Sequence, residues 1–239
     1  MSKNLFLSGS EPGIIRKLNT LGYNTVICEP NDSLDSAVRS HADCALFTPD
    51  GNTYFTGENN YNNIVNILTK GECKEKEKKA IYKVYDIKSP YPGDVKLNAK
   101  TFGRKILCNR NHISREIADF AENNGFELMH CNQGYAACST VKLNDYAAIT
   151  DDESVYNTLS ANGIDTIIVS KGSVKLNGFD YGFIGGCCGT IENNLIIFTG
   201  SIDRHCDSEK IKTFLIKHGM NYFCLTDGDL IDIGGIIAL

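Results

Sequence analysis

Three cysteines at matching places in the chain could carry thiol chemistry. Cys44, Cys138 and Cys187 each precede a threonine by the same spacing, and Cys188 follows the last of them directly. Thiols that converge from repeated units could form a nucleophilic or metal-binding cluster. A repeated need for a small apolar side chain explains the spacing without chemistry. Cys138 and Cys188 are the candidate nucleophiles, and the glycines around Cys188 leave room for a ligand.

Histidines are the candidate proton carriers. His205 lies close to Asp203 in the sequence and could act as a general base, although it could equally be a surface residue before a helix that begins at Ser208. His130 is the other candidate. The pairs His41 with Cys44, His130 with Cys131 and His205 with Cys206 each offer a metal two ligands. None has a second pair at a spacing that completes a zinc site, so we predict neither a metal nor a cofactor.

Glycine-rich segments between the repeats contain carboxylates that could bind a ligand. A pocket lined by several carboxylates suits a cationic or amino-acid-like molecule. Asp and Gly also shape turns, which accounts for any one of these residues without a ligand. The candidate ligand-binding residues are Asp94, Gln133, Asp180, Cys187 and Asp232.

The elements that carry these residues form a repeat. Each cysteine-to-threonine stretch has a turn sequence in its middle, which predicts a hairpin of two short strands. A fourth copy runs from Lys96 to Cys108. An amphipathic segment suited to a helix follows each hairpin, then a glycine that can end the helix and an apolar return strand. These glycines are Gly22, Gly71, Gly125, Gly163 and Gly219.

The two ends of the chain complete one another in this pattern. The first unit lacks its opening strand, because residues 4–8 correspond to the second strand of the other hairpins. Residues 234–239 form a strand with no local partner. Pairing them closes five ββαβ units into a five-fold pseudosymmetric β/α propeller, and the whole chain, 1–239, is then one domain.

Composition narrows the class of protein. The chain has 239 residues and a net charge of −5, which argues against bare nucleic acid as the main partner. The apolar run near the first residues is too short for a signal peptide, and no apolar stretch is long enough for a membrane span. We therefore expect a cytoplasmic protein whose ten cysteines stay reduced.

Five ββαβ units in a ring resemble the pentein fold of the guanidino-group-modifying enzymes. The segments 133–139, 178–187 and 232–237 are also similar to an uncharacterised, mostly clostridial family assigned to that fold. The resemblance implies a catalytic cysteine in the glycine-rich segment before the last strand, but this chain has no cysteine after Cys224. It also implies a catalytic histidine just before the strand near Cys138, where the chain has Gln133.

Three functions follow from these patterns. The first is a protein that binds a small polar or cationic molecule in a central channel, without the usual cysteine and histidine machinery. The second is a hydrolase of guanidino or amide groups with a relocated nucleophile, Cys188 or Cys138, assisted by His205 or His130. The third is a non-catalytic interaction module like the ribosome anti-association factor of the same fold.

Overall fold

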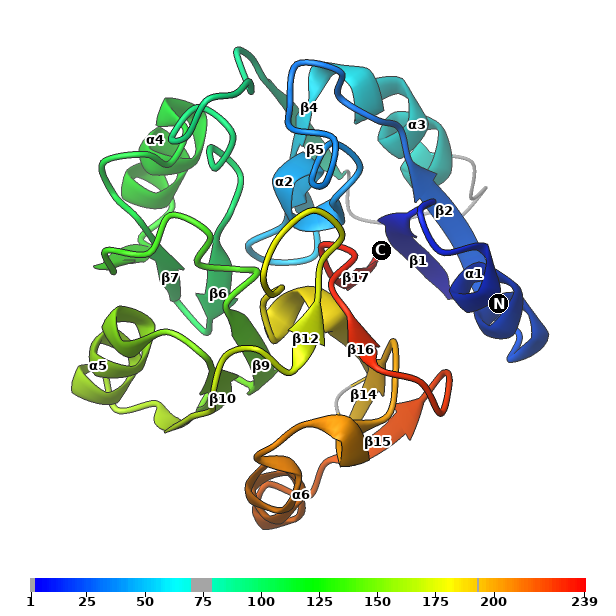
Figure 1. Cartoon of the computed structure of the whole chain (residues 1–239). Coiled ribbons are helices and arrows are strands. Elements are labelled where there is room, and N and C mark those ends of the chain that lie inside the picture. Colours follow the sequence, from blue (N-terminus) through cyan, green and yellow to red (C-terminus); the bar gives the residue numbers. More distant parts are fainter. Residues whose placement is uncertain (1–2, 70–78, 193) are drawn as a thin grey trace.

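The computed structural model describes residues 3–69, 79–192 and 194–239, which form a mixed α/β fold of small sheets. The longer helices lie at the periphery, and β12 (Val174–Lys175) and β16 (Leu230–Ile231) lie over the centre (Figure 1). The helices are α1 (Pro12–Thr20), α2 (Ala42–Ala45), α3 (Glu58–Thr69), α4 (Arg115–Asn123), α5 (Glu153–Ala161) and α6 (Ser208–Lys217), with the 3-10 turns η1 (Gly185–Cys187) and η2 (Ile202–Arg204).

Three-stranded sheets recur along the described chain. Each has a middle strand that pairs antiparallel with one neighbour and parallel with the other, and a helix connects the parallel pair. In spatial order the strands are β17 (Ile236–Ala238), β1 (Asn4–Ser8) and β2 (Asn24–Cys28); β3 (Leu46–Phe47), β4 (Thr53–Gly57) and β5 (Ala80–Val84); β6 (Lys100–Phe102), β7 (Lys105–Cys108) and β8 (Glu127–His130); β9 (Thr140–Asn144), β10 (Ala147–Thr150) and β11 (Asp165–Ile168); β13 (Cys188–Glu192), β14 (Leu195–Phe198) and β15 (Asn221–Cys224).

Helix ends follow the sequence signals. Ser114 caps α4, because its hydroxyl accepts a hydrogen bond from the backbone N–H of Ile117. Pro12 occupies the first turn of α1, where its missing N–H leaves no hydrogen bond unmade. Four of the five predicted stop glycines have positive φ, namely Gly22, Gly125, Gly163 and Gly219; Gly71 lies outside the described residues.

The C-terminal strand pairs with the first strand. β17 runs antiparallel to β1, with Leu5 opposite Ala238 and Leu7 opposite Ile236. The edge of β1 that would otherwise be open is therefore covered, which confirms that the C-terminal segment pairs with residues 4–8. The strand is shorter than the predicted 234–239, because Gly234 and Gly235 have positive φ and lie outside it. Leu5, Leu7 and Ile236 are buried in one apolar cluster with residues of α1, so the end of the chain is part of the core.

The repeated cysteines lie before the hairpins rather than in their strands. Cys44 is in the short helix α2, Cys187 is in the turn η1, and Cys138 lies two residues before β9 begins at Thr140. In the unit that starts with β6, the equivalent place belongs to Asn98, not to Lys96, because the β6–β7 hairpin is shorter than the others. The repeat therefore aligns three thiols with an amide.

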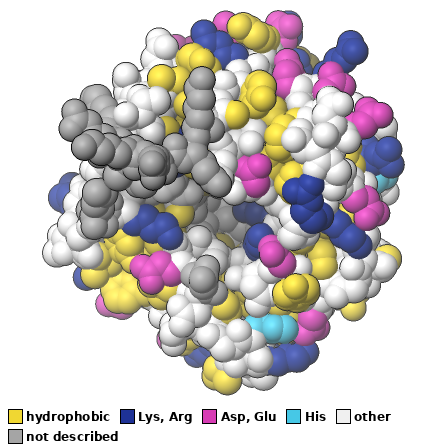
Figure 2. Space-filling model, turned by 180° about the vertical axis from the view of Figure 1, so that it is seen from behind, with side chains coloured by type: hydrophobic (Ala, Val, Ile, Leu, Met, Phe, Trp, Pro, Cys, Tyr) yellow, Lys and Arg dark blue, Asp and Glu magenta, His cyan; other side chains and the backbone are white. Residues whose placement is uncertain are grey.

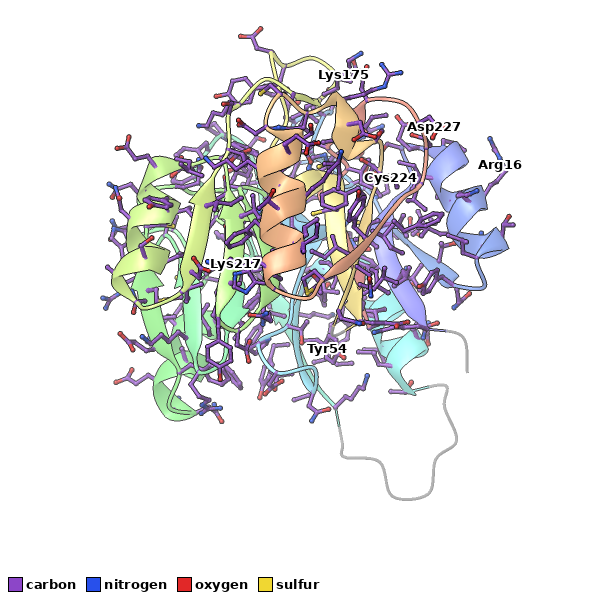
Figure 3. The ribbon with its side chains drawn as sticks, turned by 90° about the horizontal axis from the view of Figure 1, so that it is seen from below. Arg16, Tyr54, Lys175, Lys217, Cys224 and Asp227 are labelled. Atoms are coloured by element: carbon purple, nitrogen blue, oxygen red, sulfur yellow. The ribbon has the colours of Figure 1, made fainter. Side chains whose placement is uncertain are left out.

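One small sheet is absent from the predicted pattern. β12 and β16 pair in parallel, with Val174 opposite Leu230, and join two segments that the repeat leaves unassigned. Figure 3 shows Lys175, on β12, at the opposite side of the molecule from Tyr54, on β4. The β12–β16 sheet therefore covers one face, and the residues on either side of it line the site described below.

The face opposite the β12–β16 sheet carries charges of both signs. Figure 2 shows Lys and Arg side chains interspersed with Asp and Glu on the face seen from behind.

Among the helices of the described residues, none is both long enough and apolar enough to span a bilayer.

Candidate functional site

A pocket of about 500 Å³ lies beside Cys138, and we call it the Cys138 pocket. Its volume is in the range of sites that take small molecules. Residues from distant parts of the chain line it, including His41, Asp94, Tyr135, Cys138, Phe183 and Asp232. The segment after β12 supplies Phe183, and the segment before β17 supplies Asp232. The pocket therefore forms where the connections between the sheets converge.

Asn98 holds the backbone of Cys138 in place. Its side-chain oxygen accepts hydrogen bonds from the N–H groups of Ala137 (2.6 Å) and Cys138 (3.3 Å). Its amide nitrogen donates to the sulfur of Cys138 at 3.3 Å and lies 3.8 Å from the sulfur of Cys44. Asn98 is 1% exposed, so these bonds form away from water, where unmade ones would be costly. The thiol is consequently held in one orientation.

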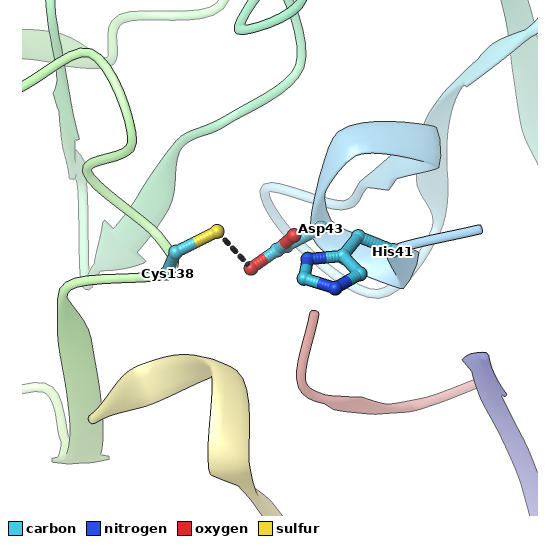
Figure 4. A group of neighbouring side chains, drawn as sticks. All are labelled: His41, Asp43 and Cys138. Carbon is cyan, nitrogen blue, oxygen red and sulfur yellow. Dashed lines mark hydrogen bonds between the residues drawn. The ribbon is translucent and has the colours of Figure 1, made fainter. Parts of the chain in front are cut away.

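The thiol of Cys138 points at the carboxylate of Asp43. Cys138 Sγ donates to Asp43 Oδ2 over 2.6 Å, as Figure 4 shows. Asp43 lies on α2, and its backbone N–H donates to the carbonyl of Gly234 at 3.0 Å. The other carboxylate oxygen, Oδ1, is buried and has no hydrogen-bond partner among the described residues. Asp43 can therefore take the thiol proton without first losing another bond.

His41 and Asp232 form a second buried pair beside the thiol. His41 Nδ1 lies 3.7 Å from Asp232 Oδ1, and both side chains are almost fully buried. Asp232 accepts hydrogen bonds from the N–H groups of Phe183 and Gly234, each at 2.9 Å. A Cβ on Gly234 would lie 2.3 Å from Cβ of His41, and the φ of Gly234 is +74°, so only glycine fits against this histidine.

Burial sets the protonation of the Cys138–Asp43 pair. Loss of solvent is the largest cause that raises the pKa of Cys138 well above its ordinary value, with Cys44 and Asp43 adding to it. Burial also raises the pKa of Asp43 to about 6, although the charge of nearby His41 opposes this. Near neutral pH the thiol is therefore protonated and the carboxylate is ionised.

Asp94 and Tyr135 form the other polar wall of the Cys138 pocket. The Tyr135 hydroxyl donates to Asp94 Oδ2 at 2.6 Å, and burial followed by this bond raises the pKa of Tyr135. Asp94 is 4% exposed, and its Oδ1 is buried with no hydrogen-bond partner among the described residues. A carboxylate oxygen in that state can accept a hydrogen bond from a ligand N–H group.

The ligand atoms of His41, Asp43 and Cys138 all lie within 4.8 Å of one another, which is close enough for them to hold one metal ion. Imidazole, carboxylate and thiolate are ligands that zinc accepts. In a tetrahedral zinc site a sulfur and an oxygen ligand are roughly 3.5 Å apart, from the usual bond lengths. The sulfur and oxygen of Cys138 and Asp43 are 2.6 Å apart. This separation is shorter than that of two zinc ligands, and the contact is that of a thiol donating to a carboxylate.

Four of the predicted site residues come together. Cys138, Asp94, Asp180 and Asp232 all line the Cys138 pocket. Cys188 lines a different pocket, of about 200 Å³, with Lys100, Asp43 and residues of β17. Asp43 therefore lies between the two pockets, in contact with the Cys138 thiol on one side.

The remaining predicted residues have other surroundings. Cys187 is fully buried, and its thiol donates to the carbonyl of Ile184 at 3.1 Å. Gln133 bonds to Asp152 and to the N–H of Tyr135, which fixes a turn. The ring of His205 accepts a bond from the N–H of Asp207.

The two histidines that we paired with a nucleophile lie away from Cys138. Asp203, the expected partner of His205, forms an ion pair with Lys212 instead. His130 lies at the end of β8 and lines an open depression with Asp151 and Asp152.

Two important residues were not assigned to a site from the sequence. Asp43 appeared only inside the pattern from His41 to Cys44, where we considered metal ligands and not a proton acceptor. Asn98 follows no motif, and only its place two residues before β6, equivalent to that of Cys138, could have identified it.

Solved structures share this architecture. DDAH from Pseudomonas aeruginosa, a cysteine-to-serine mutant complexed with citrulline, has a TM-score of 0.58 at 8% identity, with all of both chains covered. Agmatine deiminase from C. jejuni gives 0.54 at 12% identity, covering 99% of this chain and 93% of that one. Inosamine-phosphate amidinotransferase from Streptomyces griseus gives 0.51 at 14%, covering 93% and 75%. The fold is therefore that of the penteins.

The sequence itself identifies a family within that fold. Residues 7–237 match the profile of the Family of unknown function (DUF6873). The chain belongs to this family. No curated protein matches the sequence significantly. The mostly clostridial membership suggested by the sequence stays a prediction.

Proposed function

We propose that this protein binds a small cation with a guanidino group in the Cys138 pocket, and that Cys138 attacks the central carbon of that group. One observation carries the proposal: a thiol bonded to a buried carboxylate lines a pocket with Asp94, His41 and Asp232. The pentein fold, whose solved members include a deiminase and an amidinotransferase, supports the choice of the guanidino group. Cys138 is then the relocated nucleophile.

A bound cation stabilises the thiolate form of Cys138, which is disfavoured in the free protein. The thiol is protonated because burial disfavours its charged form. A guanidinium ion in the Cys138 pocket would stabilise the thiolate, so its arrival favours transfer of the proton to Asp43. The thiolate forms in the presence of substrate and is otherwise protected from reaction.

The proposed reaction proceeds in two steps. In the first, the thiolate forms a C–S bond to the guanidinium carbon, and a C–N bond breaks. The departing nitrogen takes the proton held by Asp43 and leaves as ammonia or an amine. In the second, water attacks the same carbon, the C–S bond breaks, and one of the two protons of the water passes to the sulfur. The product is a urea, and His41, at the pocket wall, can receive a proton from the water.

A pair of matched reagents tests the proposal. 2-Chloroacetamidine is a cation and 2-chloroacetamide is its neutral analogue, and both alkylate thiols. The experiment uses Cys206→Ser protein, because Cys206 is an exposed thiol. We expect the amidine to modify Cys138 faster than the amide by at least tenfold, with peptide mapping by mass spectrometry to assign the site. Equal rates, or modification that persists in Cys138→Ser and is lost in Cys188→Ser, would overturn it.

Turnover distinguishes an enzyme from a binding protein. A thermal-shift screen of guanidino compounds should give a ligand, because binding to the native state raises its stability. Incubation with that ligand should release a urea from wild-type protein and none from Cys138→Ser. Binding without release in either protein would favour the ligand-binding function without catalysis.

For the architecture, we propose that the sheets form one five-fold ring and a single domain, closed by β17. The pairing of β17 with β1 supports this arrangement, since it links the last segment of the chain to the first. A single cooperative unfolding transition for the whole chain would agree with it. Two separated transitions would contradict it.

A further inference from the structure

The charges that line the Cys138 pocket are almost all negative. Its carboxylates are Asp35, Asp94, Asp180 and Asp232, and His41 is the single basic side chain among the described residues that line it. Lys171 lies near the rim, with its ammonium 5.7 Å from the ring centre of Tyr181, but that ammonium also lies 3.9 Å from Asp152. The lining therefore attracts cations and repels anions.

These carboxylates lie at two depths. Asp94 and Asp232 are each 4% exposed, whereas Asp35 and Asp180 are exposed. The buried Oδ1 of Asp94 has no hydrogen-bond partner in the described part of the chain. Asp94 and Asp232 line the same pocket as the Cys138 thiol, so the two buried charges lie on the wall that also holds the sulfur. One positive group can therefore bind deep in the pocket and a second at its mouth.

Aromatic rings line the Cys138 pocket between its buried and its exposed carboxylates. Tyr135 and Phe183 have their ring centres 5.9 Å apart, and Tyr91 lies 6.1 Å from Tyr135. Toward solvent, Tyr91, Phe179 and Tyr181 are 49%, 54% and 38% exposed although all three line the pocket. Such rings pack against methylene groups and attract cations at their faces. A short alkyl chain between two positive groups fits this wall.

We infer that the ligand is an organic dication: a guanidinium head near Cys138, a short alkyl chain, and an ammonium tail at the mouth, with no carboxylate. The head lies between Asp94 and Asp232, and the tail lies near Asp35 and Asp180. An α-amino acid would place its carboxylate beside the last two residues, where like charges repel. The inference rests on the proposed function and sharpens it by excluding free amino acids.

Three ligands that share one guanidinium head test the inference. Agmatine is arginine without its carboxylate, and arginine methyl ester keeps the α-ammonium but masks that charge. Titration calorimetry on Cys138→Ser protein, which lacks the proposed nucleophile, measures binding alone. We expect agmatine and the ester to bind at least tenfold more tightly than arginine. If arginine binds as tightly as either, this inference fails and the proposed function stands. If no guanidino compound binds, both fail.

Substitutions at the mouth test where the tail lies. Asp35→Asn and Asp180→Asn should each weaken agmatine binding by about two- to fivefold, which corresponds to the free energy of an exposed ion pair. They should leave methylguanidine, which has the head but no tail, unchanged. Asp227→Asn, outside the residues that line the pocket, is the matched control and should affect neither ligand. Two results would overturn this placement of the ammonium tail. One is an unchanged agmatine affinity in the double variant Asp35→Asn/Asp180→Asn, and the other is an equal loss of affinity for agmatine and methylguanidine.

Discussion

The carboxylate of Asp232 lies against the bare Cα of Gly186. A Cβ at position 186 would be 1.9 Å from Asp232 Oδ1, far inside the contact distance. The carbonyl of Gly186 also accepts the N–H groups of Ile233 (3.0 Å) and Gly235 (2.8 Å), so the two segments cannot separate easily. The place of Asp232 in the pocket wall therefore depends on a glycine in a different unit.

Gly186→Ala should displace Asp232 and weaken ligand binding. The added methyl group forces the carboxylate away from the N–H groups of Phe183 and Gly234, which now hold it. We expect at least a tenfold loss of agmatine affinity by titration calorimetry. Gly13→Ala, in α1 with open space around it, is the control and should keep the affinity while raising stability by at most about 1 kcal/mol. Unchanged affinity in Gly186→Ala would contradict the role given to Asp232.

Ionisation of the buried Asp151 carboxyl should lower the free energy of unfolding as the pH rises. Burial raises the pKa of its carboxyl to about 7 from 3.8, so the folded protein binds this proton more tightly than the unfolded chain does. The free energy of unfolding should therefore fall from about pH 4 to about pH 7 and then level off, by on the order of 2–4 kcal/mol for this group. The buried Asp43, with a pKa of about 6, adds a smaller decrease in the same direction.

Asp151→Asn tests this pH dependence. Its side-chain oxygen can still accept the N–H of Ile184, which Asp151 binds at 2.8 Å, but the side chain no longer ionises. Urea midpoints should fall less between pH 4 and pH 8 in Asp151→Asn than in wild type, at equal m values. Asp32→Asn, whose side chain is 88% exposed, should follow wild type. Parallel curves for Asp151→Asn and wild type would exclude a titrating Asp151.

Local elements could be predicted from the sequence because local signals determine them. The hairpins, the cap at Ser114 and the stop glycines depend on turn and helix chemistry within a few residues. The pairing of β17 with β1 required one further step, the counting of strands in each repeat. These predictions therefore needed no knowledge of distant contacts.

The site could be predicted only in part because its contacts are distant in sequence. Asp43 and Cys138 are separated by 95 positions, and no periodic pattern links them. The carboxylates Asp94, Asp180 and Asp232 were found because they lie in the connecting segments that converge on the pocket. Asn98 was missed because an amide resembles a turn residue until its partners are known.

Asn98→Ala should both destabilise the protein and misplace the thiol. The N–H groups of Ala137 and Cys138 would lose their acceptor in a buried place, which costs roughly 1–3 kcal/mol for each unsatisfied group. Urea unfolding measures this loss. The rate of Cys138 modification by 2-chloroacetamidine should also fall, under conditions where the variant remains folded. Asn124→Ala, at an exposed helix end, is the control and should change neither quantity by much. A wild-type modification rate in Asn98→Ala would show that the thiol needs no such support.

Ile236→Ala tests whether β17 supports the whole fold. Ile236 is 4% exposed and packs in the cluster that contains Leu5 and Leu7, so its truncation leaves a cavity between the first and last segments of the chain. Isoleucine-to-alanine changes at such sites cost about 2–5 kcal/mol. The control is Ile216→Ala on α6, where the same side chain is 75% exposed and the expected change is within about 0.5 kcal/mol. If β17 closes the fold, the loss in Ile236→Ala should lower the single unfolding midpoint followed by both circular dichroism and tyrosine fluorescence. If β17 were only a peripheral strand, the variant would fray locally and keep the wild-type midpoint, because unfolding of the remaining sheets would not depend on it.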